Sequence, residues 1–211
     1  MFIPPAFAEL DQGKLHDFIR SHSFGLLVST QKEEPFATHL PFLLEPDKGS
    51  HGSLIGHMAR ANPHWQGLDG QQVLVVFSGP HTYISPSWYE AENVVPTWNY
   101  VAVHAYGVIR LIEDPNILAH ILTATVETYE RKMPNPWSID TDADFFQKLA
   151  RAVVGFRVEI NRLEGKWKLN QNHPEERRQK VAHALEMSTD PDAREIARLM
   201  REMLSGQTET R

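Results

Sequence analysis

The sequence contains no cysteine, so it can form neither a disulfide framework nor a thiolate metal site. None of its 11 histidines follows the spacings H-x-x-x-H or H-E-x-x-H, which leaves a zinc site without support. No apolar run is long enough to span a bilayer, and the amino-terminal residues MFIPPAFAEL lack the basic and apolar regions of a signal peptide. We therefore expect a cytoplasmic protein that has no metal site and no contact with membranes.

Positive charge is also scarce. The chain has 21 lysines and arginines against 27 aspartates and glutamates, a net charge of −6, which argues against a broad nucleic-acid footprint. Its 211 residues are enough to bury a sizeable core in one domain with appendages. We expect a domain with inserted helices over residues 1–172 and a helical extension, packed on it, over residues 173–211.

Short apolar segments bounded by turn residues predict a block of strands. Pro41 interrupts one of them and implies an edge strand or a bulge, because proline donates no hydrogen bond to a sheet. Gln71–Ser78 is apolar on both faces and is expected in the centre of the sheet. The predicted strands are Phe24–Thr30, Phe36–Glu45, Ser53–Arg60, Gln71–Ser78, Val94–Arg110 and Val154–Asn161.

Helices are predicted before, between and after these strands. Asp114-Pro115 is a typical helix start, with Asp at the cap and Pro at the first position. Gly79–Glu92 is expected to be a loop, and Glu164-Gly165 a turn. The fold class is therefore mainly β with α (α+β), a small β-barrel with peripheral helices and a C-terminal helical pair. The other predicted helices follow Asp11 or cover Asp142–Ala152, Pro174–Met187 and Asp190–Leu204.

The segment Val94–Arg110 has the clearest pattern. From Tyr100 onward, Val101, Val103 and Ala105 fall on one face of the strand, and polar or aromatic residues fall on the other. Trp98, Asn99 and Tyr100 lie at its entry, where an indole, an amide and a phenol together suit a flat ring with a polar edge. The alternative is a core strand with aromatic ends.

Three further segments are candidates for binding. Arg60 leaves a strand beside His57 and Asn62 and suits a phosphate, or is a solvated arginine. The hydroxyl and aromatic residues of 77–89 suit a ligand, or hydrogen-bond their own loop. Residues 166–172, KWKLNQN, offer lysines for a phosphate or a ring nitrogen and amides for a ring edge, or form a hairpin edge and a helix cap.

Together these segments resemble one family. The blocks MFIPPAF, ATHLPFLLE, GHMARANPHW, VVFSGPHTYISPSWY, VVPTWNYVAVHAYG and KWKLNQN are similar to those of the PaiB-like, FMN-binding negative transcriptional regulators. They run in order from Met1 to Asn172, and six separated blocks make the resemblance specific. It implies a split β-barrel of the pyridoxamine-phosphate-oxidase type, a homodimer with flavin sites at its interface, and a role in repressing protease-synthesis and sporulation genes.

The resemblance also implies the binding residues. Arg60 and a lysine of the segment Lys166–Lys168 would meet the FMN phosphate, and residues 78–85 and 97–100 would meet the ring or ribityl chain. Asn170 departs from the family pattern, in which a serine is expected. The candidate FMN-binding residues are His57, Met58, Arg60, Asn62, Ser78, Tyr83, Ser85, Thr97, Trp98, Asn99, Tyr100, Lys168, Asn170 and Gln171.

Two other functions stay open, an FMN-dependent oxidoreductase and a haem-binding or haem-degrading protein on the same barrel. No residue has an evident general-base partner, so catalytic residues are not assigned. A spatial cluster of His39, His57 and His104, or a haem-ligating histidine, also stays open. The last two helices could be mistaken for a helix-turn-helix, but glutamates dilute their basic residues, so we do not expect direct, specific DNA binding.

Overall fold

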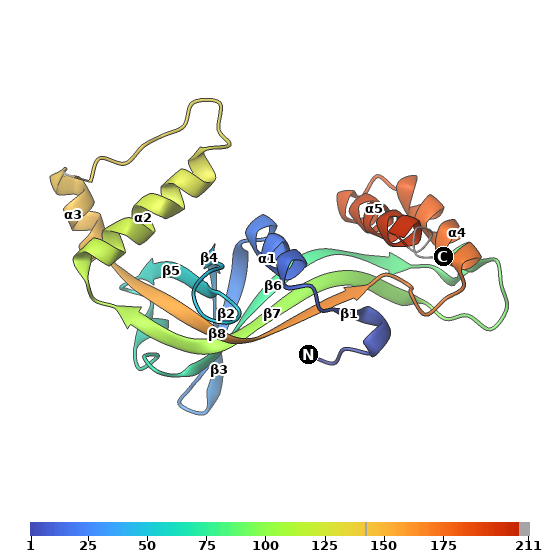
Figure 1. Cartoon of the computed structure of the whole chain (residues 1–211), viewed down its shortest axis with the longest axis horizontal. Helices are drawn as coiled ribbons and strands as arrows, with labels where there is room; N and C mark the ends of the chain where they lie inside the picture. Colours follow the sequence, from blue (N-terminus) through green and yellow to red (C-terminus); the bar gives the residue numbers. More distant parts are fainter. Residues whose placement is uncertain (142, 207–211) are drawn as a thin grey trace. The chain divides into compact units, whose positions relative to one another are not determined.

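The computed structural model describes residues 1–141 and 143–206. The strands are β1 Ala8–Glu9, β2 Phe24–Gln31, β3 Glu34–Pro41, β4 Leu43–Glu45, β5 Ser53–Ala59, β6 Gln72–Ile84, β7 Thr97–Ile112 and β8 Val153–Lys168 (Figure 1). The α-helices are α1 Gln12–Ser21, α2 Pro115–Glu130, α3 Asp144–Arg151, α4 Glu175–Glu186 and α5 Pro191–Gly206. Three 3-10 helices, η1 Pro5–Phe7, η2 Pro63–Trp65 and η3 Pro86–Tyr89, complete the assignment.

One sheet contains all eight strands. Its order is β3-β2-β6-β7-β8-β5-β4, and β1 pairs separately with β8. The pairings between β2 and β3, β2 and β6, β4 and β5, and β5 and β8 are all antiparallel. Strand β6 is central, and Pro41 ends the edge strand β3, so both of these predictions are confirmed. The predicted α+β class is also confirmed.

The contacts divide the described residues into two compact units. Unit 1 contains Met1–Asp11, Ser78–Val103 and the chain from Glu164 onward. Unit 2 contains Gln12–Phe77 and His104–Leu163. Strands β6, β7 and β8 each contribute residues to both units.

Unit 2 has an aromatic core. The ring of Phe42 packs edge-on against Phe77 and Phe156, with centroids 5.7 and 5.9 Å apart. Gly107 of β7 lies so close to β8 that a Cβ there would be 2.3 Å from the carbonyl oxygen of Glu159, so only glycine fits. The carboxylate of Asp114 accepts hydrogen bonds from the backbone N–H groups of Asn116 and Ile117, which confirms the predicted start of α2.

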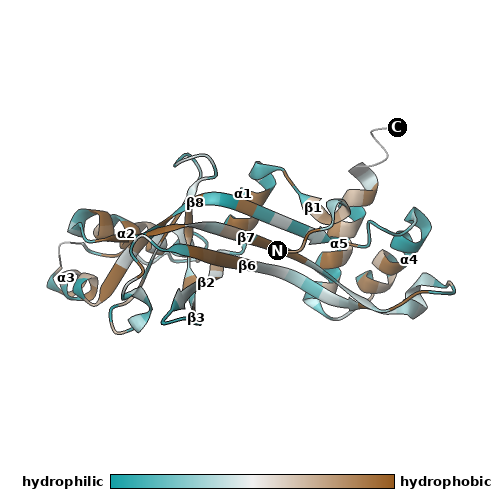
Figure 2. Cartoon of the chain, turned by 90° about the horizontal axis from the view of Figure 1, so that it is seen from below, coloured by the Kyte–Doolittle hydropathy of each residue, from teal (hydrophilic) through white to brown (hydrophobic). Residues whose placement is uncertain are grey.

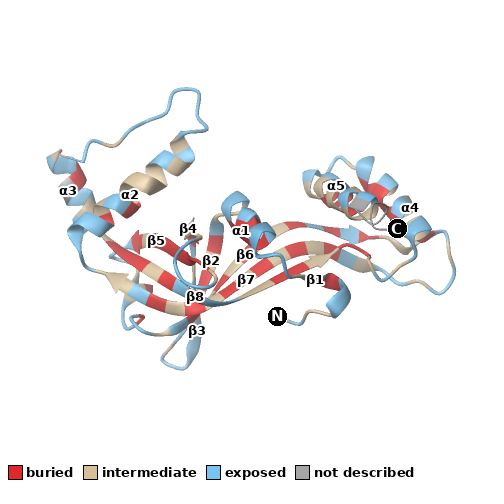
Figure 3. Ribbon diagram, in the orientation of Figure 1, coloured by how far each residue is buried: buried red, intermediate tan, exposed pale blue. Residues whose placement is uncertain are grey.

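Unit 1 buries one face of β7 beneath its terminal helices. Asn99, Val101 and Val103 are fully or almost fully buried, and the side chain of Asn99 reaches Met200 of α5. Buried and half-buried residues alternate along β7, as Figure 3 shows. Figure 2 shows apolar residues along parts of β6 and β7. The side chains of the residues between the buried positions lie on the other face of β7.

Two predicted connections are strands instead. Gly79–Ile84 was expected in a loop but continues β6, and Glu164-Gly165 was expected to turn the chain but lies inside β8. Gly165 pairs with Glu9 of β1, so an added strand holds this glycine extended. The predicted C-terminal helical pair is confirmed as α4 and α5. Of the helix predicted over Asp142–Ala152, the first residue lies outside the described residues.

Within residues 1–141 and 143–206, no helix has the length and apolarity needed to cross a bilayer.

Candidate functional site

Along β6 the alternation of buried and exposed residues changes phase, and this change determines which side chains lie on the exposed face of unit 1. Residues with odd numbers are buried from Val73 to Phe77, whereas Pro80, Thr82 and Ile84 are buried farther along the strand. The alternation therefore shifts by one residue at Ser78-Gly79. Because of this shift, the side chains of His81 and Tyr83 are exposed, and that of Ser78 is exposed at the shift itself.

A pocket of about 290 Å³ lies on this face. Its volume is at the lower end of the range of small-molecule sites, enough for one end of a nucleotide-sized ligand. Its walls come from β6 and β7, and the structure brings Ser78, Trp98 and Tyr100 together in them. The lining residues are Ser78, Gly79, His81, Trp98, Tyr100, Val101 and Ala102.

Aromatic side chains border the pocket. The indole of Trp98 is 54% exposed, although a tryptophan is normally buried in large part. The ring of Tyr83 meets it edge-on at 6.1 Å, and the imidazole of His81 lies 6.2 Å from it. The flat face of Trp98 is thus held by its neighbours and remains open to a planar ligand.

Two lysines of β8 bring positive charge to the same unit. The ammonium group of Lys168 donates to the hydroxyl of Thr97 and to the carbonyl of Trp98. Lys166 is buried, donates to the carbonyl of Phe2 at 3.0 Å and lies 5.0 Å from the ring centroid of Tyr100. Burial lowers the pKa of Lys168, and the charge of Lys166 lowers it further. Neither lysine forms an ion pair with a residue that the structure describes.

The three predicted amides make their contacts inside the protein, although the Oδ1 atom of Asn99 is buried without a hydrogen-bond partner among the described residues. Asn99 is fully buried, and its Nδ2 lies 3.6 Å from the sulfur of Met200. Asn170 adopts φ +63° and donates to the hydroxyl of Tyr89 at 2.8 Å. Gln171 bonds the backbone at Trp167 and Leu169. The structure therefore does not bring these amides into the pocket lining, and Ser85 instead caps η3 by accepting from the N–H of Ser87.

The other predicted site residues belong to unit 2. Met58 is a core residue of β5, and His57 beside it is half-buried, with a buried Nδ1 that has no hydrogen-bond partner among the described residues. Asn62 caps η2 and donates to Thr38. Arg60 is exposed, and its guanidinium donates to the carbonyls of Arg151 and Val153 at 2.9 and 3.0 Å. Two of its five N–H donors are used in this way, so the others remain for an anion. Its role as a phosphate anchor stays a prediction.

Sequence reasoning missed several residues. Val101 and Ala102 line the pocket without having been predicted as site residues, and Gly79 and His81 lie in the segment 78–85 that was expected to meet the ring but were not among the candidate residues. Reading 79–84 as strand would have placed His81 on the exposed face with Tyr83, whereas the alternation along β7 assigns Val101 to the core and gives no signal for its place in the lining. Among the residues that the structure describes, no group of His, Asp and Glu could hold a metal ion.

Three histidines make folding sensitive to acid. Burial lowers the pKa of His57, His64 and His173 below the ordinary value of 6.5, and for His173 the charges of Arg177 and Lys168 add to the effect. Above that value both states are neutral, and below it the unfolded chain takes up protons first. The free energy of unfolding is therefore expected to fall as the pH drops from 6.5 toward the folded-state pKa values, by up to about 1.4 kcal/mol per pH unit for each proton.

Urea unfolding at pH 7.5, 6.5 and 5.5 measures this loss. His64 is the best residue for the comparison because it is fully buried, with Ser29 and Thr38 hydroxyls 2.9 and 2.7 Å from its ring nitrogens. His64→Gln should reduce the slope of stability against pH, whatever it does to stability at pH 7.5. An unchanged slope would contradict the assignment.

The comparisons with known proteins agree with this architecture. The family model FMN_bind_2, described as "Putative FMN-binding domain", matches residues 1–162. The chain belongs to this FMN-binding family. A curated relative, "Protease synthase and sporulation protein PAI 2" of Bacillus subtilis (strain 168), is 37% identical over 209 residues, which cover 98% of this chain and 100% of the relative. The resemblance to PaiB-like proteins is therefore confirmed.

Solved structures support the fold of this FMN-binding family member. A FAD and haem-binding protein of Mycobacterium smegmatis matches with a TM-score of 0.58 and 14% identity over 76% of this chain and 73% of that one. The flavocytochrome Anf3 of Azotobacter vinelandii matches with a TM-score of 0.57 and 17% identity over 76% and 69%. At these identities the likeness shows the fold alone, and the predicted split β-barrel is confirmed.

Proposed function

We propose that this chain binds FMN against the pocket face of unit 1 and acts as a flavin-binding regulator of the PaiB type. The observation that carries the proposal is the open indole of Trp98 beside a pocket and beside Lys168, a half-buried cation without a carboxylate partner among the described residues. A planar, electron-poor ring can stack on the indole of Trp98, and its polar edge can accept a hydrogen bond from the ammonium group of Lys168.

The types of residue at the pocket suit such a ring. Trp98 and Tyr100 supply aromatic surface, Ser78 supplies a hydroxyl, and the ammonium group of Lys168 can meet an electron-rich edge of the ring. A bound flavin would supply electron transfer. The chain's own part is to hold the ring, to exclude water from its face and to offset negative charge at its edge.

A phosphate-binding role of Arg60, in unit 2, stays a separate proposal, because an acidic protein must offset a phosphate locally and its guanidinium retains free donors. His57, Met58 and Asn62 accompany it in sequence. This assignment concerns unit 2 and is tested separately from the ring site.

We propose further that the protein is a homodimer. Exposed aromatic side chains of unit 1 support this: Trp98 and Tyr83 are 54 and 45% exposed, and surfaces of this kind are typical of interfaces. A second copy that covers the pocket face would also deepen a pocket that is shallow for a whole nucleotide.

Regulation through direct reading of DNA is not part of the proposal. Arg198 is paired with Glu195 and Glu202, and Arg201 with Glu186, so two of the three arginines of α5 are neutralised, and Arg194 donates to the carbonyls of Ser188 and Thr189. On α4, Lys180 is paired with Glu90 and Glu176. Since nucleic-acid affinity depends on unneutralised cations facing phosphates, we expect weak binding to duplex DNA at physiological salt.

Native mass spectrometry of the purified protein tests the proposal, because it gives ligand mass and subunit number together. We expect a dimer, the mass of FMN and a flavin absorption spectrum. Trp98→Ala should weaken FMN about fivefold to tenfold, since an aromatic contact contributes about 1 kcal/mol beyond buried area. Trp137→Ala is the matched control, an equally exposed indole in unit 2.

Other outcomes separate the alternatives. A Soret band in place of the flavin spectrum would favour the haem-binding protein. Bleaching of bound flavin by NAD(P)H would favour the oxidoreductase. A protein that binds neither FMN nor riboflavin overturns the proposal.

A further inference from the structure

Unit 1 holds a second group of basic residues, beyond the pocket lining. Lys168 ends β8, His173 lies in the turn that follows, and Arg177 lies in the first turns of α4. The imidazole of His173 stacks on the buried ring of Tyr89, with centroids 4.7 Å apart. All three basic side chains are half-buried. We call them the basic cluster.

The members of the basic cluster are arranged around Tyr89. His173 stacks on its ring, α4, which carries Arg177, contacts η3, which contains Tyr89, and Lys168 lies two residues before Asn170, which donates to the Tyr89 hydroxyl. Burial lowers the pKa of His173, and the charges of Arg177 and Lys168 accordingly lower it further. Tyr89 in turn receives a hydrogen bond from Asn170, which fixes the turn between β8 and α4. Tyr89 and Asn170 therefore hold the three side chains of the basic cluster in one region of the surface.

The basic cluster has no anion of its own. Arg177 and His173 form neither an ion pair nor a side-chain hydrogen bond with any residue that the structure describes, and Lys168 donates only to neutral oxygens. Basic groups that are partly desolvated and not neutralised repel one another, which costs folding free energy. An arrangement of this kind is stabilised when an anion binds.

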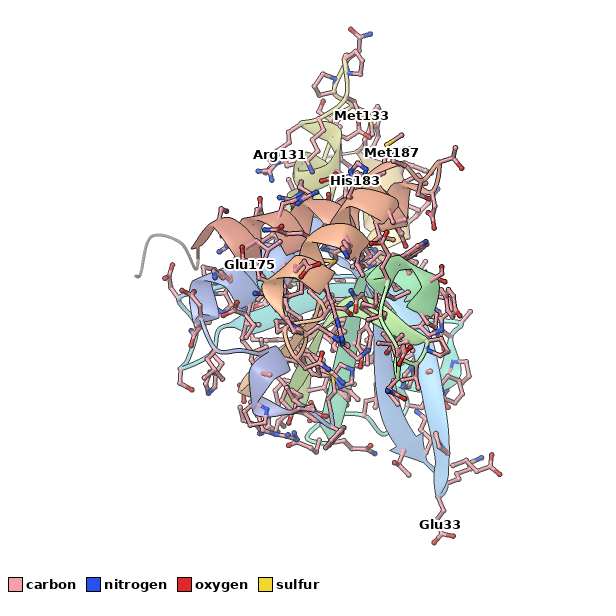
Figure 4. The ribbon with its side chains drawn as sticks, turned by 90° about the vertical axis from the view of Figure 1, so that its right-hand side faces the viewer. Glu33, Arg131, Met133, Glu175, His183 and Met187 are labelled. Carbon is pink, nitrogen blue, oxygen red and sulfur yellow. The ribbon has the colours of Figure 1, made fainter. Side chains whose placement is uncertain are left out.

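The carboxylates near α4 interact with residues outside the basic cluster. Glu175, labelled in Figure 4, accepts a hydrogen bond from Gln179 at 2.9 Å. Glu176 pairs with Lys180 at 3.0 Å, so both acids interact with residues one helical turn farther along α4. Glu90 pairs with Lys180 as well. The first N–H groups of α4 receive no side-chain cap from Pro174, and they add partial positive charge at this end of the helix.

We propose that the basic cluster of Lys168, His173 and Arg177 is an anion site that takes a phosphate group. Arg177 supplies the forked donors that match phosphate oxygens, His173 supplies one N–H, and Lys168 supplies charge beside Trp98. Either the flavin or a separate phosphorylated ligand can bring this group, and the site does not depend on flavin binding. In the second case the site gives the regulator a means to sense an acidic ligand.

Titration of the purified, ligand-free protein with inorganic phosphate tests the site, with calorimetry or nitrogen-15 shifts of the Arg177 side chain as readout. Arg177→Gln should weaken phosphate binding about tenfold or more, and Arg177→Lys should recover only part of the loss, because an ammonium group cannot fork. Arg131→Gln is the matched control, an exposed arginine in unit 2 without an ion pair among the described residues (Figure 4). It should leave phosphate binding unchanged.

Flavin identifies the source of the phosphate. If FMN displaces inorganic phosphate while riboflavin does not, the site takes the flavin's own phosphate, and Arg177→Gln weakens FMN but not riboflavin. If phosphate binds equally to FMN-loaded and ligand-free protein, the site takes a second ligand. Absence of phosphate binding, or equal loss in Arg177→Gln and Arg131→Gln, overturns the anion site. Flavin binding that persists in that case leaves the proposed function standing.

Discussion

Methionine in place of Lys168 is expected to weaken both FMN and riboflavin about thirtyfold. The Lys168 ammonium group is half-buried beside Trp98, and burial has already lowered its pKa. An electron-rich ring edge placed against it gains a charge-assisted hydrogen bond, and removing one partner of such a pair costs about 2 kcal/mol at a partly exposed position. By the usual conversion this is about thirtyfold in affinity. Since the contact is with the ring, riboflavin is weakened as well as FMN, and any additional loss for FMN measures the charge that Lys168 contributes to the phosphate site.

Methionine keeps the length and the apolar stem of the side chain, so the packing of β8 changes little. Fluorescence titration measures both ligands, and circular dichroism checks the fold. Lys132→Met, at an exposed position of unit 2, controls for the loss of one positive charge. Thr97→Val removes one acceptor of Lys168 but keeps its charge, so it should cost less than Lys168→Met. Wild-type affinity in Lys168→Met would remove Lys168 from the ring site.

The sequence predicts the strands well where one face is apolar, as along β7, and fails where turn residues occur inside a strand. Gly79-Pro80 was interpreted as the start of a loop because both residues are typical of turns. In the structure β2 pairs with β6 only over Leu74–Val76, so the missing N–H of Pro80 costs no hydrogen bond to β2. The length over which two strands pair is determined by the tertiary fold, and the sequence of one strand does not show it.

The candidate site is predicted in part. Trp98 and Tyr100 line the pocket as expected, because they lie on the exposed face of β7. Asn99 lies between them in sequence and so points to the buried face, where α5 covers it. The alternation that assigned Val101 to the core could have assigned Asn99 as well. The basic cluster was not predicted, because it depends on the turn at Asn170, which donates to Tyr89, and on the packing of α4 against η3.

Alanine in place of Arg60 is expected to have two separate effects. The guanidinium now donates to the carbonyls of Arg151 and Val153 at the end of α3, and it lies 5.8 Å from the ring centroid of Trp65. Losing these contacts should lower the free energy of unfolding by about 1 kcal/mol, because exposed carbonyls regain water. If the free donors also hold the FMN phosphate, FMN affinity should fall about thirtyfold, as the loss of a charge-assisted pair predicts.

Riboflavin separates these effects, because it has the same ring and no phosphate. Arg60→Ala should bind riboflavin within about threefold of the wild type, a difference of about 0.7 kcal/mol, and FMN much more weakly. Arg60→Lys should restore part of the FMN affinity and little of the helix contact, since an ammonium group cannot donate in two fixed directions. Thermal unfolding of the ligand-free variants reports the helix contact alone. Equal losses for FMN and riboflavin would mean that Arg60 acts only by holding the end of α3, and the phosphate anchor would have to be sought in another residue.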